Sequence, residues 1–270
     1  MSFFTSLSGM RNAETDLQVV SNNIANAETA GFKKSSAQFS DLVASGGSTD
    51  PRTTPGIGAT VSRISQDFGL GQLEQTGRGL DIAINGDGFI TTVNPISSNT
   101  SYTRNGNLEI VASGALQDAF GEQVQGFPVD AAGNPTTLVP GAIIVPTTNA
   151  AGSLLATVGF DARGVLTATY SDSTNEPVAM LALASFPATG GLRTIGQTKW
   201  EATNESGAPE FGQPGVGNYG AVATGTLERS NVDLAEEMVS LLTAQRNFQA
   251  NARAIDTATA ISQTVLNLQR

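Results

Sequence analysis

The sequence predicts an α+β protein with an all-β central domain of short strands between long N- and C-terminal helices. Both ends of the chain carry apolar residues at alternating steps of three and four, which is the period of a helix. Nearly all of the 30 Gly and 11 Pro residues fall between these ends. In that central part, short apolar runs alternate with turn dipeptides, a pattern typical of all-β domains.

The N-terminal helix is expected within residues 1–30. Gly9 is the one Gly or Pro before residue 31. The apolar stripe expected to face another helix includes Leu7, Met10, Leu17, Val20 and Ile24. This spacing is heptad-like and indicates coiled-coil-like pairing. Gly31 lies where a C-cap glycine would end the element.

The middle of the chain is predicted to hold a connector and a β domain. Residues 31–75 are expected to form an extended connector, because residues 45–57 are rich in Gly, Ser, Thr and Pro. The β domain is expected over residues 76–229. Its strongest hairpin signal is the Asn85-Gly86 pair, which stands between two alternating apolar runs. Apolar runs at 142–145 and 178–183 predict buried strands.

The C-terminal helix is expected within residues 230–270. Ser230 is the predicted N-cap, with an acidic residue, Asp233, three positions later. No Gly or Pro follows it. The apolar stripe of this helix includes Leu234, Met238, Leu241, Phe248, Ile255 and Val265. We expect the two terminal helices to form a coiled-coil-like inner layer.

Composition excludes several classes of function. The formal net charge of −10 argues against nucleic-acid binding, which needs a basic surface. The chain has no Cys and no His, which excludes disulfides, thiolate nucleophiles, imidazole bases and Cys/His zinc sites. We therefore expect no enzymatic activity, no catalytic residue, no metal and no cofactor. No segment approaches the roughly 20 apolar residues of a membrane helix, so no membrane insertion is expected.

Other interpretations were weighed against the residues. The glycine-rich run at 85–88 lacks the helix and the Gly-Lys pair of a phosphate-binding loop, so a turn is favoured. The turns at Asp130 and Asp161 lack the alternating oxygen ligands of a calcium loop. A glycan hydrolase would need a pair of carboxylates, and no pair stands out. Neither a hydrolase nor an adhesion module accounts for two matched terminal helices.

The terminal helices favour self-assembly. Both are long and amphipathic, and little else in the chain is available to bury their apolar stripes. We therefore expect them to pair within a subunit and then to stack between identical subunits. Head-to-tail stacking that does not close into a ring produces a helical filament.

Several motifs resemble those of bacterial flagellar rod and hook proteins, in the order found in that family. Residues 21–33 resemble its N-terminal signature, with Asn22, Asn23, Asn26, Gly31 and Phe32. Residues 76–89 resemble the motif that opens its β domain, with Gly77, Arg78, Asp81, Gly86 and Gly88. Residues 230–234 and 244–251 resemble its C-terminal signature, with Asn231, Gln245, Arg246 and Asn251.

Within this family the resemblance is closest to hook proteins, because residues 64–68 and 245–251 are hook-like. One departure concerns the outer domain that hook proteins usually carry after the strand corresponding to 143–146. Here only residues 147–156 precede the next predicted strand. We therefore expect a short-form hook subunit without the outer domain. The alternative is a distal rod subunit of the basal body, whose length the chain approaches.

The resemblance implies a mechanical role. Hook subunits form a hollow, flexible helical tube that couples the rod to the filament and transmits torque. The implied partners are further copies of the chain, the distal rod protein, the hook cap and hook–filament junction proteins, and the flagellar type III export apparatus. The implied location is the extracellular flagellum, in its hook or basal body, reached without a cleaved signal peptide. We also expect a thinner tube than that of full-length hooks, and helices that are disordered in the free monomer.

Overall fold

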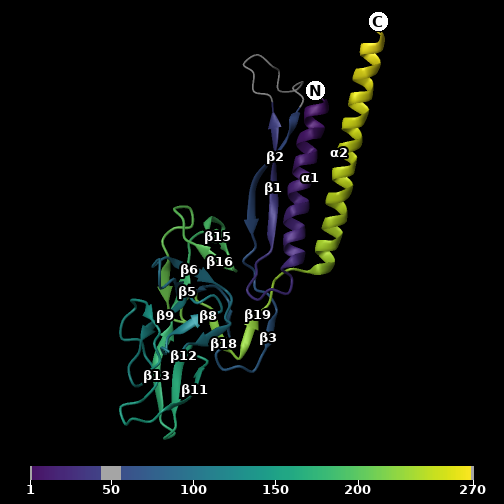
Figure 1. Cartoon of the computed structure of the whole chain (residues 1–270). Helices are drawn as coiled ribbons and strands as arrows, with labels where there is room; N and C mark the ends of the chain where they lie inside the picture. The colour runs from purple at the N-terminus through teal and green to yellow at the C-terminus, as the bar shows by residue number, and fades with distance from the viewer. Residues whose placement is uncertain (1, 44–55, 269–270) are drawn as a thin grey trace. The chain divides into compact units, whose positions relative to one another are not determined.

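A computed structural model describes residues 2–43 and 56–268, and the chain divides into two compact units. The helical unit is built from residues 1–27, 34–67 and 232–270. The β unit is built from residues 28–33 and 68–231. Figure 1 labels the elements of both units. The predicted mixture of two terminal helices and a β-rich centre is confirmed, whereas the coiled-coil character of the helices stays a prediction.

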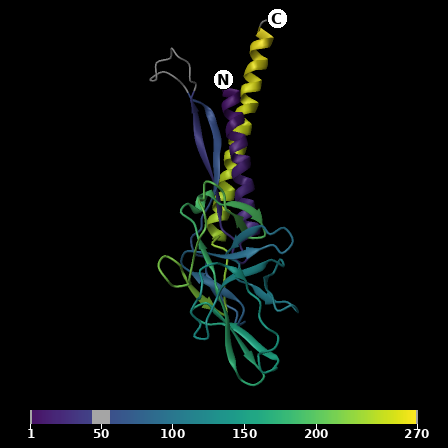
Figure 2. The same ribbon diagram turned by 90° about the vertical axis from the view of Figure 1, so that its left-hand side faces the viewer.

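The helical unit contains two helices and one hairpin. Helix α1 covers Ser2–Ala25 and helix α2 covers Leu234–Leu268. The strands β1 (Ser35–Val43) and β2 (Gly56–Gln66) are antiparallel, from the pair Ser35 and Gln66 at one end to Val43 and Gly56 at the other. Figures 1 and 2 both show α1 and α2 side by side, with the hairpin along α1.

The hairpin differs from the sequence-based expectation. Residues 31–75 were expected to be an extended connector, but most of the described part forms β1 and β2. Residues 44–55, which include most of the Gly- and Ser-rich stretch, lie outside the described residues. Both strands are largely exposed, so they lack the clear apolar alternation that identifies a half-buried strand. Packing against α1 stabilises them instead.

Both predicted helix caps need correction. Helix α1 ends at Ala25, so Gly31 is not its C-cap. At the start of α2, Asp233 is the N-cap, because its Oδ1 accepts hydrogen bonds from the backbone N–H groups of Ala235 and Glu236. Ser230 lies before the helix begins. A carboxylate at the N-terminus of α2 also suits the helix dipole.

The β unit consists of short antiparallel strands. Its main sheet follows the order β11-β12-β13-β9-β5-β6-β16-β15, with β10, β14, β17, β7 and β8 attached beside this path. Two small sheets pair β18 with β4 and β19 with β3. The strands are β3 (Leu73–Gln75), β4 (Ile82–Asn85), β5 (Phe89–Val93), β6 (Thr100–Thr103), β7 (Leu108–Ile110), β8 (Leu116–Asp118), β9 (Gln123–Pro128), β10 (Gly141–Ala142), β11 (Leu155–Phe160), β12 (Val165–Tyr170), β13 (Asn175–Leu181), β14 (Leu183–Ser185), β15 (Arg193–Gly196), β16 (Lys199–Glu201), β17 (Glu210–Gly212), β18 (Ala221–Thr224) and β19 (Thr226–Glu228).

The hairpin predicted at Asn85-Gly86 is wrong. Strand β4 pairs with β18, whereas β5 pairs with β6, β9 and β14, so the two strands beside the turn belong to different sheets. Gly86 and Gly88 both have φ of 124°, which is not the geometry of a two-residue hairpin turn. A Cβ on Gly86 would lie 2.9 Å from Gly220 Cα, so close backbone approach requires glycine here.

The turns at Asp130 and Asp161 are ordinary Asx turns, as expected. Oδ1 of Asp130 accepts hydrogen bonds from the N–H groups of Ala132 and Asn134. Oδ1 of Asp161 accepts hydrogen bonds in the same way at positions two and four residues later. These short-range bonds explain why Asp is favoured at such positions.

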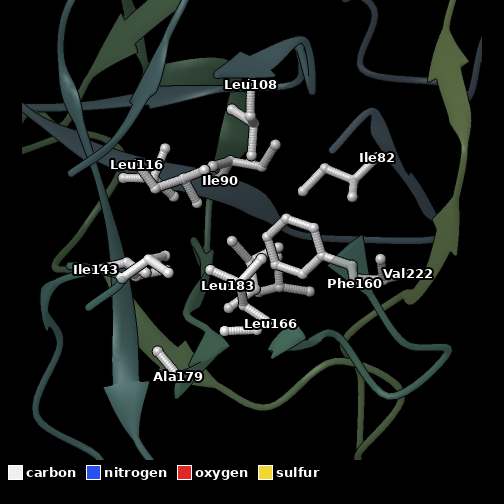
Figure 3. Packing of buried hydrophobic residues seen from close by; sticks show 14 of the residues in the cluster. Ile82, Ile90, Leu108, Leu116, Ile143, Phe160, Leu166, Ala179, Leu183 and Val222 are labelled. Carbon is white, nitrogen blue, oxygen red and sulfur yellow. The ribbon is translucent and has the colours of Figure 1, made fainter. Parts of the chain in front are cut away.

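The β unit has an apolar core. Its main cluster is shown in Figure 3, where aliphatic side chains from β4, β5, β7, β8, β12 and β14 converge with Phe160 of β11 and Val222 of β18. An aromatic cluster of Phe89, Tyr102, Phe186 and Trp200 packs edge to face, with ring centroids 4.8–5.9 Å apart. Residues 179–183 are fully or almost fully buried, which confirms the burial predicted for that run. The buried strand predicted at 142–145 is wrong, because Ala142 and Ile144 are exposed and β10 ends at Ala142. Each fully buried Leu, Ile or Phe side chain of this core stabilises the fold by about 1.5–3 kcal/mol.

Candidate assembly surface

Two contacts fix the register of α1 against α2. The Nδ2 of Asn23 donates a hydrogen bond to Oε2 of Glu237 at 3.1 Å. At the other end, a Cβ on Gly9 would lie 2.6 Å from Oδ1 of Asn251, so glycine allows close approach. The number of residues from Gly9 to Asn23 on α1 equals the number from Glu237 to Asn251 on α2. The two antiparallel helices therefore keep one register between these contacts. It places Ser2 opposite residue 258, and residues 259–268 of α2 extend past α1 (Figure 1).

The predicted apolar stripes are partly covered within the helical unit. Val20 is buried, together with Ala13 and Ala244, which were not among the predicted contact residues. Seven predicted residues are partly exposed, namely Leu7, Met10, Leu17, Ile24, Leu241, Phe248 and Ile255. Leu234 and Met238 are exposed, and the side chain of Val265 lies outside the described residues. The stripes are therefore only partly satisfied by pairing within one chain.

An exposed apolar row on α2 was only half recognised from the sequence. It consists of Leu234, Met238, Val239 and Leu242, and Val239 is 65% exposed. These positions are spaced so that all four lie on one side of the helix. The helical spacing of three and four residues led us to include Leu241 in the predicted stripe and to omit Val239 and Leu242. The spacing from Leu234 through Met238 to Leu242 was also present in the sequence. We call these four residues the α2 apolar row.

A charged cluster lies beside the start of α2. Lys34 Nζ is 2.9 Å from Glu237 Oε1 and 3.2 Å from Glu236 Oε2. The hydrogen bond to Glu237 is the main reason why the pKa of Lys34 is raised. Burial and the nearby Glu237 carboxylate raise the pKa of Asp16 on α1. The cluster joins the strand that begins at Ser35 to α2 and sets both elements against α1.

The motif residues in the helical unit position the backbone. Asn23 is buried, and its side-chain amide donates to Ser35 O at 2.8 Å and accepts from Ser35 N at 3.0 Å. Asn26 extends the end of α1 by donating to the carbonyl of Asn22 at 2.9 Å. Asn251 donates to the carbonyl of Asn247 at 2.9 Å, and Gln245 and Arg246 are exposed on α2. Asn23 therefore fixes where β1 begins.

The motif residues in the β unit also serve backbone geometry. Gly31 has φ of 70°, and a Cβ added at this position would lie 2.6 Å from Asn105 N. Gly77 also has a positive φ, of 75°. Asp81 is buried and accepts a hydrogen bond from Thr76 Oγ1 at 2.7 Å. The remaining motif residues are Phe32, which is partly exposed, Arg78, which lies 3.6 Å from Asp81, and Asn231, which donates to Gly69 O at 3.3 Å.

A buried ionic cluster in the β unit was missed by the sequence analysis. Lys33 Nζ lies 2.5 Å from Glu228 Oε1, and Arg104 Nη1 lies 3.5 Å from Glu228 Oε2. Glu228 Oε1 also accepts a hydrogen bond from Gly71 N, and Lys33 donates to Gly69 O. These charges are close in space but far apart in sequence. Only Lys33 gave a signal, through its place at the end of the N-terminal motif.

Other features do not indicate a catalytic or metal site. Among the described residues no three His, Cys, Asp or Glu side chains are grouped to hold a metal ion. No helix in the described parts of the chain is long and apolar enough to cross a membrane. A groove of about 390 Å³ lies between α1 and the hairpin, lined by Leu7, Arg11 and Val61 among others. Its polar side chains form no recognisable set of catalytic groups.

Comparison with known proteins identifies three matching family models. Residues 4–33 match the model "Flagella basal body rod protein". Residues 83–168 match "Flagellar hook protein FlgE/F/G D1 domain". Residues 223–268 match "Flagellar basal body rod FlgEFG protein C-terminal". The matches fall on both helices and on the β unit, in agreement with the motifs quoted above.

Full-length relatives agree with these models. The chain is 33% identical to the flagellar basal-body rod protein FlgG of Bacillus subtilis over 280 residues, covering 100% of the chain and 99% of the relative. It is 29% identical to FlgG of Borreliella burgdorferi over 280 residues, covering 99% and 98%. It is 26% identical to the flagellar hook protein FlgE of Escherichia coli over 412 residues, covering 100% of both.

Proposed function

Because the chain belongs to the family of flagellar basal-body rod and hook proteins, we propose that it polymerises through its helical unit into an axial tube of the flagellum. The observation that carries this proposal is the α2 apolar row, which is exposed in the single chain. A contiguous apolar surface of this kind is typical of an interaction site. The last turns of α2, which extend past α1, carry two more exposed apolar residues, Ile261 and Leu266.

A structural role agrees with the chemistry of the motif residues. Asn23, Gly31 and Asp81 each hold a backbone segment in place within their own unit. The relatives that the chain resembles are rod and hook proteins and not enzymes. We therefore infer that the subunit is a structural protein of the flagellum.

Within this role we assign the chain to the hook, as a short form without an outer domain. The hook-like stretches at 64–68 and 245–251 support this assignment. The structure adds that residues 147–154 form a short turn between Val145 and β11, with Asn149 N donating to Ser153 O at 3.1 Å. A turn of this length has no room for an inserted domain. The subunit would then form a thin hook that couples rod to filament and transmits torque.

The distal rod is the second candidate, and the length of the relatives favours it. Alignment with FlgG of Bacillus subtilis spans 280 residues, close to the 270 of this chain, whereas alignment with FlgE of Escherichia coli spans 412. Identity is also higher with the rod protein. For either identity the proposed partners are neighbouring copies, the distal rod, hook cap and junction proteins, and the type III export apparatus. The proposed location is the extracellular flagellum.

Electron microscopy of basal structures from cells that lack the gene separates the two identities. Rods without hooks establish the hook assignment. Loss of the distal rod transfers the assignment to the rod. Intact rods and hooks would overturn both. Because further axial proteins build on this subunit, the deletion strain must be complemented with the wild-type chain as a control.

A pair of variants tests the α2 apolar row itself. Met238→Asp places a charge in the row and is expected to abolish polymers in cells. Asn247→Asp adds the same charge on another exposed side of α2 and is expected to leave polymers intact. Both variants are expressed at matched levels and examined by electron microscopy. Polymers of normal length with Met238→Asp would contradict the proposed interface.

A further inference from the structure

A second ionic cluster in the β unit has an unusual composition. Lys199, the first residue of β16, lies between two carboxylates. Its Nζ is 2.7 Å from Asp118 Oδ2 and 2.9 Å from Glu122 Oε2. The side chains of Lys199, Asp118 and Glu122 are only 3%, 5% and 14% exposed. One buried cation thus faces two carboxylates, so the cluster has an excess negative charge and a large desolvation cost.

The geometry points to a covalent bond in place of an ordinary ion pair. Among the described residues, neither Lys199 Nζ nor Asp118 Oδ2 has a hydrogen-bond partner in proper geometry, although the two atoms are close. The other oxygen, Asp118 Oδ1, accepts hydrogen bonds from the backbone N–H groups of Phe120 at 3.0 Å and Glu122 at 2.9 Å. These are the bonds of an Asx turn like those at Asp130 and Asp161. At Asp118, where a lysine lies beside the carboxyl group, the same two donors would stabilise the negative charge that develops on Oδ1 under nucleophilic attack.

Glu122 is placed to carry protons. Its Oε2 accepts hydrogen bonds from the hydroxyls of Ser101 and Thr92, which fix the carboxylate beside Lys199. Burial acts to raise the pKa of Glu122, but contacts with Ser101, Lys199 and Thr92 outweigh burial and lower it. The group is therefore ionised and can accept a proton from the lysine nitrogen.

We infer that Lys199 and Asp118 condense to an isopeptide bond once the β unit has folded. The Nζ ammonium first transfers a proton to Asp118 Oδ2. The neutral amine then attacks Cγ with its electron pair, and charge develops on Oδ1. Glu122 takes a second proton from the nitrogen and passes it to the Oδ2 hydroxyl. The Cγ–Oδ2 bond breaks, water leaves, and an amide remains. No oxidant or further reactant is required, and two buried charges are lost.

The Lys33–Glu228 pair provides an internal comparison. Lys33 Nζ donates proper hydrogen bonds to Gly69 O and to Glu228 Oε1. Its carboxylate partner faces a second cation, Arg104, and no second carboxylate. Two cations there keep the single carboxylate ionised, and the cluster contains no second carboxylate to take a proton from Lys33, so this pair is expected to stay ionic. The two sites differ in chemistry although both lysines are buried.

The bond would link the end of β8 to the start of β16, which lie far apart in the sequence. It would close a covalent loop through β9 to β15 and so resist separation of these strands under load. That this resistance to load is useful to a torque-bearing subunit rests on the proposed function. The inference that the bond forms does not rest on it, because the bond forms within one chain. Because the bond forms only after folding, the chain would carry no cross-link while it is exported in the unfolded state.

Mass spectrometry of the purified full-length chain tests the inference. The intact mass should be lower than the sequence mass by one water molecule. Because trypsin does not cleave after an acylated lysine, the digest should contain residues 105–163 joined to residues 194–229. This linked peptide distinguishes the bond from loss of water elsewhere, for example at Asp87-Gly88. A folded wild-type chain with the full sequence mass, and no linked peptide, would overturn the inference.

Matched variants assign the roles. Lys199→Arg and Asp118→Ala should restore the full sequence mass of each variant, because neither can form the amide, and Lys33→Arg should retain the loss of water. Glu122→Gln should slow bond formation at least about tenfold, measured on chains recovered unfolded from inclusion bodies, before any bond has formed, and then allowed to fold. Circular dichroism and Trp200 fluorescence confirm that each variant is folded. Unchanged bond formation in Glu122→Gln would remove Glu122 from the mechanism, and a linked peptide in Lys199→Arg would overturn the bond assignment.

Discussion

Large apolar side chains are fully buried in the core of the β unit, whereas the buried apolar side chains described for the helical unit are few and no larger than valine. Ile90, Leu116 and Leu183 in the β unit have no exposed surface. In the helical unit the buried apolar side chains are few and small or β-branched, such as Ala13 and Val20, and the α2 apolar row is exposed. Folding free energy comes mainly from apolar burial. The comparison therefore indicates one unit that is stable by itself and one that depends on neighbouring copies.

Amide exchange should show the largest difference between the units. In the free monomer we expect α1 and α2 to exchange at nearly the rate of an unfolded chain, because isolated helix pairs with little buried surface are marginal. Strands β5, β9 and β13 should be strongly protected. In the polymer both units should be protected. Strong protection of residues 5–27 and 235–265 in the monomer would contradict the dependence on neighbours.

Removing the charge of Glu228 should strongly destabilise the β unit. Glu228→Gln leaves Lys33 and Arg104 buried without their counter-charge, which should cost about 3–5 kcal/mol. Glu201→Gln removes one partner of the exposed pair with Arg193 and should cost at most about 1 kcal/mol. Urea unfolding followed by the fluorescence of Trp200, the only Trp of the chain, measures both. Equal losses of unfolding free energy in the two variants would show that burial of the Glu228 cluster does not increase the contribution of its ion pairs to stability.

Truncation of the apolar core should be nearly as costly. Leu183→Ala removes a fully buried side chain from the main cluster and should cost about 2–5 kcal/mol. Leu154→Ala truncates an exposed side chain and should change the free energy of unfolding by less than about 0.5 kcal/mol. The same fluorescence titration applies. A small effect of Leu183→Ala would mean that the core collapses around the missing side chain.

Loss of the Asn23 side chain should affect the helical unit only when that unit is folded. Asn23→Ala removes the hydrogen bonds to Ser35 and Glu237 and should cost about 1–3 kcal/mol. We expect heat to dissociate the variant polymer at a lower temperature, while urea unfolding of the β unit is unchanged. Asn22→Ala, at an exposed position, is the control. An equal shift for both variants would contradict the anchoring role of Asn23.

The smallest effect is expected at the turn between β12 and β13. Hydrogen bonds from Thr174 and Asn149 hold the pKa of Asp172 below its ordinary value of 3.8. The folded chain therefore binds this proton less readily than the unfolded chain. Its stabilising effect is present above pH 3.8 and is lost as the pH falls below that value. The protection factor of the Thr174 amide, which corrects for the intrinsic pH dependence of exchange, should fall there, and Asp172→Asn should remove this fall.

Helices and Asx turns were predicted correctly from the sequence, whereas the residues that cap the helices were not. Helices were recognised because each is a continuous apolar period of many turns without Gly or Pro. The turns at Asp130 and Asp161 were recognised because their hydrogen bonds reach only two to four residues. Cap assignments failed by a few positions at Gly31 and Ser230, since several residues near a helix end can satisfy the same backbone groups.

Strand pairing could not be derived locally. The Asn85-Gly86 turn has the composition of a hairpin, yet β4 pairs with a strand that begins at Ala221. The hairpin of β1 and β2 was missed because neither strand shows a buried alternation. The family of the chain was nevertheless accessible, because its signatures are short stretches of contiguous residues.

The sequence by itself determined the two terminal helices, the β-rich centre, the Asx turns and membership of the rod and hook family, since each depends on residues that are near neighbours in the chain. Only the tertiary structure decided which strands pair, which side of α2 stays exposed, and how Lys33 meets Glu228 and Lys199 meets Asp118. These contacts join residues far apart in the chain. Their energies depend on burial and on the atoms around each charge, which no local pattern encodes.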